Sequence, residues 1–305
     1  MTSLALLALL VAGAGGYVSW AAHSIANGAP AWWFVLGAPV AYFAPAIVLV
    51  GLWFAVTWLW RTPRPPEAQI GLAGTLRLFI VEVLTLGVSW PLLALHRLLI
   101  HEPPPARSPR PVLLIHGVLV NDGVWLLPRR RLAQRGVAPI YTLNYGPPHA
   151  DIERFAEQLA ERIEGICSAT GAEQVSLVGH SMGGLVARAY LRRFGPRRVG
   201  KLVTMGTPHH GSILAWTFPG RGLEQMRPGN AWLADLNRHE TRAAPAPIVS
   251  IWSRHDSMVA PQASSELACA ENVPFVGIGH NALLVDEGVI ERVAREVRSL
   301  HDSRM

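Results

Sequence analysis

Gly179-His180-Ser181-Met182-Gly183 separates two apolar segments, and these five residues decide how we expect the chain to fold. Residues 174–178 (QVSLV) before it read as a short buried strand, and residues 184–194 (GLVARAYLRRF) after it read as a helix with one apolar face. A serine at such a tight turn has an exposed hydroxyl, and flanking glycines relieve clashes between turn, strand and helix. Ser181 is therefore our candidate nucleophile. The alternative is a glycine-rich turn whose serine only caps the helix.

A serine hydroxyl needs a base to take its proton, and the base needs a third group to orient it. We expect Asp256 to be the orienting acid, because a predicted strand at 248–253 (IVSIWS) ends just before it. We expect His280 to be the base, because it directly follows a predicted strand at 275–279 (FVGIG). Both would lie at the sheet edge where open α/β sheets carry their working residues. The alternatives are Asp235, Glu266 and Asp286 for the acid, and His239, His255 and His301 for the base.

Attack on an ester carbonyl produces an oxyanion, which backbone N–H donors must stabilise. Met182, directly after the serine at the start of its helix, offers one donor. The second is expected from the loop after an early strand at 111–115 (PVLLI), which His116-Gly117 opens. We therefore expect Val118 and Met182 to form the oxyanion hole. The alternative is that His116-Gly117 is only a strand-to-loop turn.

Strands and helices alternate regularly from residue 111 onward, which predicts an α/β fold with a mostly parallel sheet of about six strands and helices on both faces. Beyond the strands given above, we expect strands at 140–144 and 201–205 and helices near 124–135, 151–169 and 286–300. Between residues 210 and 247 no strand is predicted. That segment is either a helical excursion packed on the core, or a short lid or pocket wall with Trp216, Phe218 and Trp232.

Four segments resemble the α/β-hydrolase superfamily, and within it the small bacterial serine esterases and triacylglycerol lipases. They are LLIHGVLVNDGVW (113–125), VSLVGHSMGGLVARAYL (175–191), LVTMGTPHHGS (202–212), and SRHDSMVAP (253–261) with GIGH (277–280). The GTPHHGS run is the most lipase-like of these. The resemblance covers roughly residues 111–300, and it implies the same catalytic and oxyanion roles for the residues already singled out.

The first hundred residues have a different composition, since no Asp, Glu, Lys or Arg occurs before Arg61. Residues 4–22 and 32–60 are long and apolar enough to be membrane helices, and tryptophans cluster at both ends of the second. The first segment lacks the basic start of a signal peptide, which is the alternative.

Residues 72–100 are interrupted by Glu82, and a charge in a spanning helix costs roughly 2.5–3.5 kcal/mol. We favour a third span over an interfacial helix or an apolar helix packed on the hydrolase.

These features divide the chain into a membrane region (1–102) with two to three hydrophobic helices, a Pro-rich linker (103–110) and a catalytic domain (111–305). Arg61 and Arg64 predict that the loop after the second span stays in the cytoplasm. Three spans would then carry the catalytic domain to the outside of a bacterial inner membrane, and two would leave it inside. With the third span favoured, we expect it outside the cytoplasm.

Half of the residues are hydrophobic and the net charge is +6. Basic runs such as Arg129-Arg130-Arg131 carry no interleaved aromatic residues, so we expect no nucleic-acid partner; they are solvated helix faces or contacts to lipid headgroups.

Two cysteines, Cys167 and Cys269, define neither a disulfide framework nor a metal site. No histidine spacing is typical of zinc, and no oxygen-rich cluster supports the calcium that some lipases bind. We expect no cofactor and no metal.

The sequence thus predicts a membrane-anchored serine hydrolase that cleaves carboxylic esters, with a lipid acyl ester and the membrane as its partners. The same residues would also serve an acyltransferase or a thioesterase. A noncatalytic membrane interaction protein on a hydrolase scaffold is the third possibility.

Overall fold

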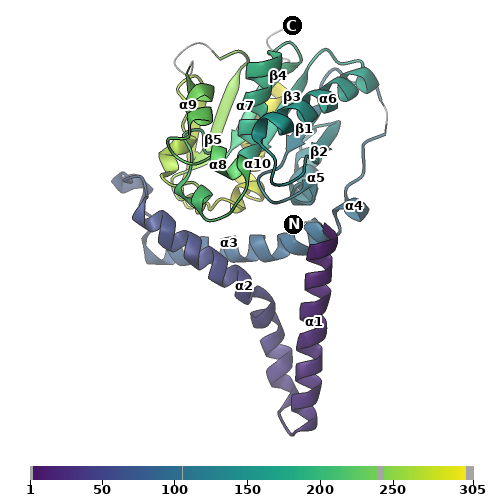
Figure 1. Cartoon of the computed structure of the whole chain (residues 1–305), viewed down its shortest axis with the longest axis vertical. Helices are drawn as coiled ribbons and strands as arrows, with labels where there is room; N and C mark the ends of the chain where they lie inside the picture. Colours follow the sequence, from purple (N-terminus) through teal and green to yellow (C-terminus); the bar gives the residue numbers. More distant parts are fainter. Residues whose placement is uncertain (1–2, 105, 239–243, 300–305) are drawn as a thin grey trace.

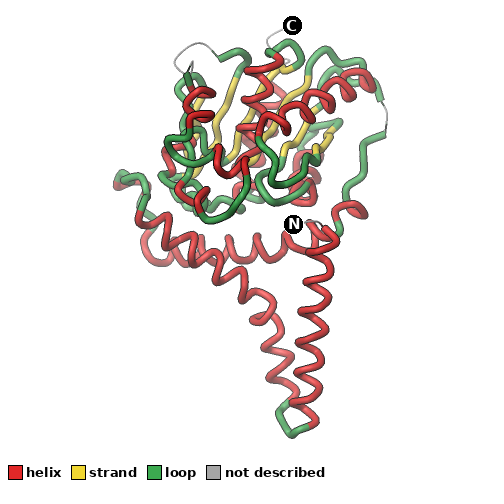
Figure 2. The backbone as a smooth tube through the Cα atoms, in the orientation of Figure 1, coloured by secondary structure: helices red, strands yellow, loops and turns green. Residues whose placement is uncertain are grey.

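The computed structural model describes residues 3–104, 106–238 and 244–299. Long apolar helices form one end of the molecule and an α/β part, residues 111–299, forms the other (Figure 1). Helices α1 (Ser3–Ala26) and α2 (Ala31–Leu59) make a hairpin that projects away from the α/β part. Helix α3 (Gly71–Ala94) lies across the base of that part and leads to the short α4 (His96–Leu99) (Figures 1 and 2).

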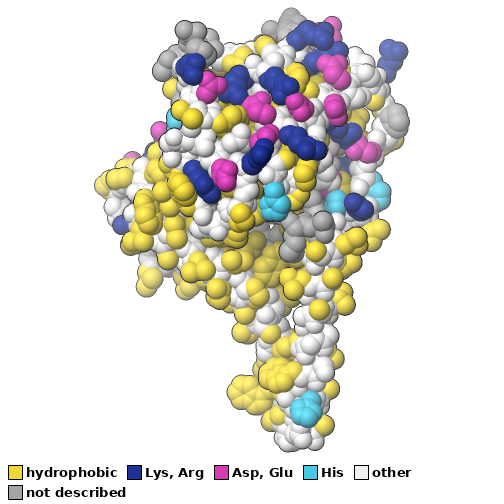
Figure 3. Space-filling view, in the orientation of Figure 1, with side chains coloured by type: hydrophobic (Ala, Val, Ile, Leu, Met, Phe, Trp, Pro, Cys, Tyr) yellow, Lys and Arg dark blue, Asp and Glu magenta, His cyan; other side chains and the backbone are white. Residues whose placement is uncertain are grey.

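All three long helices have the length and composition to cross a membrane. Apolar side chains gather over this end of the molecule, and the charged side chains lie mainly on the α/β part (Figure 3). The predicted spans match α1 and α2 closely, whereas the third predicted segment, 72–100, is divided between α3 and α4.

The sheet has six parallel strands in the order β2-β1-β3-β4-β5-β6. The strands are β1 (Val112–Ile115), β2 (Ile140–Leu143), β3 (Val175–His180), β4 (Val199–Met205), β5 (Ile248–Ser253) and β6 (Glu271–Phe275). Side chains alternate between the two faces along each strand, so Leu113 joins one core cluster and Leu114 the other. This confirms the predicted α/β class with a parallel sheet.

Helices cover both faces of the sheet, as predicted. Helices α6 (Ile152–Thr170) and α7 (Met182–Phe194) pack on one face, and α5 (Leu126–Gln134) and α10 (Glu287–Ser299) pack on the other. Helix α6 begins where the Asp151 side chain accepts the Arg154 N–H, and it ends at Gly171 in the left-handed conformation. The shorter elements are α8 (Arg221–Gln225), α9 (Ala231–Asn237), and the 3₁₀ turns η1 (Pro66–Ala68), η2 (Asp122–Trp125), η3 (Ile213–Trp216), η4 (Gln262–Ser265) and η5 (Ala282–Leu284).

The last strand was placed four residues too late by the sequence, at 275–279 instead of Glu271–Phe275. Strand β6 lies at the edge of the sheet next to β5 and is largely exposed, so it carries the polar residues Glu271 and Asn272 and also Pro274, which an edge strand tolerates. The apolar run after it is a loop, in which Gly277 has a φ of +73°. His280 therefore sits on a loop rather than directly at a strand end.

Candidate active site

Ser181 lies at the turn between β3 and α7, and its backbone is strained. Its φ of +56° and ψ of −126° fall in a region that non-glycine residues rarely adopt. Two hydrogen bonds hold this turn: the Ser181 N–H donates to Met205 O at 2.8 Å, and Thr207 Oγ1 donates to Ser181 O at 2.9 Å. The result is a serine hydroxyl projected beyond the carboxyl end of the central strand.

The turn is possible because Gly183 has no side chain. A Cβ atom at this position would lie 2.3 Å from Ile115 O and 2.6 Å from His116 O, which is closer than atoms can approach. The glycine thus lets the start of α7 press against the end of β1. The two segments that we expect to supply oxyanion donors are brought together by this contact.

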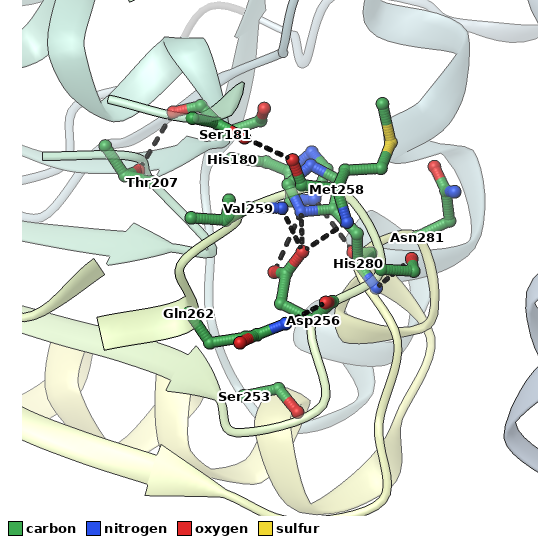
Figure 4. Close-up of polar contacts among 12 residues, drawn as sticks. His180, Ser181, Thr207, Ser253, Asp256, Met258, Val259, Gln262, His280 and Asn281 are labelled. Carbon is green, nitrogen blue, oxygen red and sulfur yellow. Dashed lines mark hydrogen bonds and ion pairs between the residues drawn. The ribbon is translucent and has the colours of Figure 1, made fainter. Parts of the chain in front are cut away.

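Asp256 and His280 lie side by side on loops at the same edge of the sheet (Figure 4). His280 Nδ1 is 2.9 Å from Asp256 Oδ2 and 3.0 Å from Asp256 Oδ1, and both side chains are buried. Asp256 Oδ1 also accepts the backbone N–H groups of Met258 and Val259, at 2.8 and 2.7 Å. Because Nδ1 donates to the carboxylate, Nε2 of neutral His280 is left with a free lone pair, as a general base requires.

The alternative acids and bases lie elsewhere. Asp235 pairs with Arg192 on the surface, Asp286 accepts the Val289 N–H at the start of α10, and Glu266 is exposed. His255 Nδ1 accepts the Gly277 N–H at 3.2 Å. His239 and His301 fall outside the described residues. The structure thus brings Ser181, Asp256 and His280 to one place.

The charge on neighbouring carboxylates affects how readily His280 takes up a proton. Burial by itself lowers the pKa of His280, but the charge and hydrogen bond of Asp256, together with the carboxylate of Glu82, raise this pKa above its ordinary value of 6.5. A protonated His280 ring would therefore be stabilised by the carboxylates of Asp256 and Glu82.

Two further residues hold the main chain of His280, and the sequence did not single out either of them. His180 Nε2 donates to His280 O at 3.1 Å, and the His280 N–H donates to Ser257 Oγ at 3.2 Å. Burial lowers the pKa of His180 to about 3, so this ring is neutral. His180 could have been noticed as the histidine inside Gly-His-Ser-Met-Gly, but the motif by itself assigns this residue only to the turn.

The loop after β1 is fixed by a stacked pair of rings. The His116 and Tyr145 rings are parallel, with centroids 4.1 Å apart, and Tyr145 Oη donates to His116 O at 2.5 Å. Val118 follows in this loop and lines the same cavity as Ser181. Met182 is the first residue of α7, next to the serine. Both expected oxyanion donors thus lie beside Ser181.

A cavity of about 570 Å³ contains both Ser181 and His280 in its wall. Most of the lining is apolar, and it comes from α1, α2 and α3 as well as from the loops of the α/β part. Its lining residues include Leu6, Trp53, Leu84, Trp90, Val118 and Leu214. In the parts of the chain that the structure describes, no three His, Cys, Asp or Glu side chains gather into a group that would hold a metal ion.

The segment after β4 contributes to this cavity, though not through all three aromatic residues that we expected. Phe218 lines the cavity together with Leu214 and Ala215 of η3. Trp216 is 61% exposed, with the Arg227 guanidinium 4.3 Å from its ring centroid, and Trp232 Nε1 donates to the Glu153 carboxylate at 2.8 Å. Neither tryptophan lines the cavity. The Trp216 ring lies against Arg227, and the Trp232 ring is bound to Glu153.

Comparison with known proteins supports this assignment of the fold. The model of the alpha/beta hydrolase fold family matches residues 143–231. A triacylglycerol lipase from Pseudarthrobacter phenanthrenivorans is 35% identical over 113 residues, which are 34% of this chain and 35% of the lipase. A 1-acylglycerol-3-phosphate O-acyltransferase from Sus scrofa is 31% identical over 136 residues, 41% of this chain and 36% of that protein. The chain spans about a third of the length of the curated relatives it matches.

Among solved structures, the mature Bacillus licheniformis lipase BlEst2 superposes with a TM-score of 0.54 at 16% identity, over 64% of this chain and 94% of the lipase. Family model, sequence relatives and superposition agree that the chain has the α/β-hydrolase fold, and its sequence is similar to lipases over about a third of its length.

Proposed function

We propose that this protein is a membrane-anchored serine hydrolase that cleaves lipid acyl esters through an acyl-enzyme. One observation carries the proposal: Ser181 and His280 open into a single apolar cavity whose wall is partly built by the membrane-type helices. Such a cavity suits a hydrocarbon chain, and a lipid bound in it would have its ester carbonyl next to the serine hydroxyl.

The proposed reaction begins when Ser181 Oγ attacks the ester carbonyl while His280 Nε2 takes its proton. Asp256 stabilises the imidazolium, and the N–H groups of Val118 and Met182 donate to the oxyanion. When the tetrahedral intermediate collapses, His280 returns the proton to the leaving alcohol and the acyl group stays on Ser181. Water, activated by His280, then attacks the acyl-enzyme and releases the fatty acid.

The contacts of α3 support a particular placement in the membrane. Before α3, Arg64 Nε donates to Arg254 O at 2.8 Å and the Thr62 N–H donates to Gln262 Oε1 at 2.9 Å. At its far end, Asn121 Nδ2 donates to Leu93 O at 2.9 Å. The segment before α3 and the carboxyl end of α3 therefore both contact the α/β part, so this helix lies along the α/β part and does not lead away from it.

The other helices return to the same side. Leu6, near the start of α1, lines the active-site cavity, and the loop after α2 contacts the α/β part through Thr62 and Arg64. We infer two spans, α1 and α2, with α3 at the membrane surface. Because Arg61 and Arg64 favour the cytoplasmic side, this places the catalytic part in the cytoplasm. The inferred side is opposite to the one we expected from three spans.

Acyl transfer is the second candidate, favoured by the resemblance to an acylglycerol-phosphate acyltransferase. It uses the same acyl-enzyme, with an alcohol taking the place of water in the second step. The lipase relatives favour hydrolysis as the main reaction.

Ser181→Ala is expected to lower kcat for p-nitrophenyl esters by at least about 10⁴-fold, because no other group replaces the nucleophile. The same variant is expected to lose labelling by a fluorophosphonate probe, measured on detergent-solubilised protein. Ser212→Ala is the matched control: Ser212 lines the same cavity but donates to Met258 O at 2.7 Å, so labelling should persist. Labelling that survives in Ser181→Ala would mean that the nucleophile is another residue.

The pH profile of kcat/KM is expected to have an acid limb above pH 6.5. Only neutral His280 can accept the Ser181 proton, and its pKa is raised, so activity is lost at a higher pH than for an ordinary histidine. Asp256→Asn removes the largest raising influence, and its acid limb should lie at lower pH while kcat falls roughly 10⁴-fold. An acid limb that stays in place in Asp256→Asn contradicts the assignment of this pair.

Ala215→Phe is expected to shorten the acyl chains that the enzyme accepts, because Ala215 is buried in the cavity wall. For long-chain p-nitrophenyl esters, kcat/KM should fall about 10- to 100-fold relative to the butyrate ester. Trp216→Phe, one residue away but outside the cavity lining, should leave this ratio unchanged. Equal loss on short and long chains would show that the chain does not pass Ala215.

A reporter at the carboxyl terminus tests the inferred side of the membrane. In a bacterial host, a green fluorescent protein fusion should fluoresce and an alkaline phosphatase fusion should be inactive, because the fused end would stay in the cytoplasm. Active alkaline phosphatase would favour three spans and an extracytoplasmic catalytic part. Replacing Arg61 and Arg64 by serine is the matched variant, and it should weaken the orientation.

A further inference from the structure

Glu82 is a fully buried carboxylate in the middle of the apolar helix α3. Its oxygens accept four hydrogen bonds from the α/β part: Ser257 Oγ at 2.8 Å, Ala282 N at 2.8 Å, and Asn281 Nδ2 and N at 3.0 and 3.3 Å. A buried carboxylate is costly unless donors satisfy it, and here four of them do so. The donors belong to only two loops.

Those two loops are the ones that carry the acid and the base. Ser257 directly follows Asp256, and Asn281 directly follows His280. The Ser257 hydroxyl also accepts the His280 N–H at 3.2 Å while it donates to Glu82. A continuous chain of hydrogen bonds therefore runs from the main chain of His280 through Ser257 to the carboxylate on α3.

The backbone before His280 is shaped to receive this carboxylate. A Cβ atom at Gly279 would lie 2.3 Å from Glu82 Cγ, Cδ and Oε1. Only glycine leaves room for the carboxylate against the chain at that point. The close approach places the Glu82 carboxyl group next to the peptide that ends at His280. Burial raises the pKa of this carboxyl group, and the hydrogen bonds from Ala282, Ser257 and Asn281 oppose that rise and favour the charged form.

We propose that Glu82 is a positioning residue of the active site: a carboxylate from the membrane region fixes the loops that present His280 and Asp256 to Ser181. This inference rests on the proposed serine-hydrolase function. It makes α3 part of the catalytic apparatus as well as part of the membrane-facing end. It also accounts for a charged residue in the middle of an apolar helix.

Three titratable groups surround His280 among the described residues. They are Asp256 after β5, Glu82 on α3 and neutral His180 at the end of β3. Asp256 contacts the ring, whereas Glu82 acts on the ring through its charge and on the main chain through Ser257. Removing the Glu82 charge should therefore change both the rate and the pH at which His280 loses its proton.

The test is Glu82→Gln in the full-length chain, solubilised in detergent, with active sites counted by fluorophosphonate titration. We expect kcat per titrated site to fall about 10- to 100-fold with little change in KM, since misplacing a catalytic group costs rate more than binding. The acid limb of kcat/KM should move to lower pH. Glu82→Asp keeps the charge, so its acid limb should stay near that of the wild type.

Glu296→Gln is the matched control. Glu296 is also a buried carboxylate, bound to Lys201 Nζ at 2.9 Å and to Arg292 Nε at 2.8 Å, but it lies on α10 away from the cavity. Its loss should lower the thermal midpoint without changing kcat per titrated site or the acid limb. A purely structural role for Glu82 predicts the same behaviour for Glu82→Gln.

The proposal is overturned if Glu82→Gln keeps the wild-type kcat per titrated site and the wild-type acid limb. Should Glu82→Gln yield no titratable protein, Ser257→Ala decides, because it removes only the hydroxyl between Glu82 and His280. An unchanged kcat in that variant also overturns the proposal, and a fall supports it. If the wild type itself neither turns over esters nor reacts with the probe, the proposed function fails instead.

Discussion

The strained backbone of Ser181 is the constraint on which the rest of this structure depends. A φ of +56° is held only because Gly183 lets α7 approach β1, and because Met205 and Thr207 bind the turn from β4. Strain of this kind costs roughly 1–3 kcal/mol and persists only where the surroundings enforce it. The central strands of the sheet supply that enforcement, and the strained turn accordingly follows β3 and not an edge strand.

Much of the site was predictable because its signals are local. The pattern Gly179 to Gly183 with its strand and helix, and the order of Asp256 and His280 along the chain, can be read without knowing the fold. The shift of β6 shows the limit of this reasoning, since an edge strand carries little of the apolar pattern that marks a buried one. His280 lies against Asp256 in the structure although its supporting strand was misplaced, and its role as the base stays a prediction.

The role of the helical region could not be predicted in the same way. Glu82 lies about 200 positions before the residues that it binds, and no periodicity connects them. The sequence presents it only as a charge that weakens a membrane span. The positions of Trp216 and Trp232 could not be predicted either, because an aromatic side chain near the site lines the cavity only if the fold turns it inward. Here the Trp216 ring lies against Arg227 and the Trp232 ring is bound to Glu153.

Helix α3 is apolar on two sides for two different reasons. One side buries Leu78 and Glu82, and Glu82 binds the α/β part, whereas Val83 packs with Ala46, Val50 and Trp53 of α2. The opposite side exposes an apolar stripe at every fourth residue: Leu72, Leu76, Ile80, Leu84 and Val88. A helix with one face on protein and the other on lipid has the hydropathy of a span without crossing the bilayer. Leu84 and Val88 also line the cavity, so the same stripe that would face lipid leads to Ser181. Under the proposed function, membrane contact and substrate entry would share one surface, and the Glu82 carboxylate on its inner side would hold the loops of Asp256 and His280.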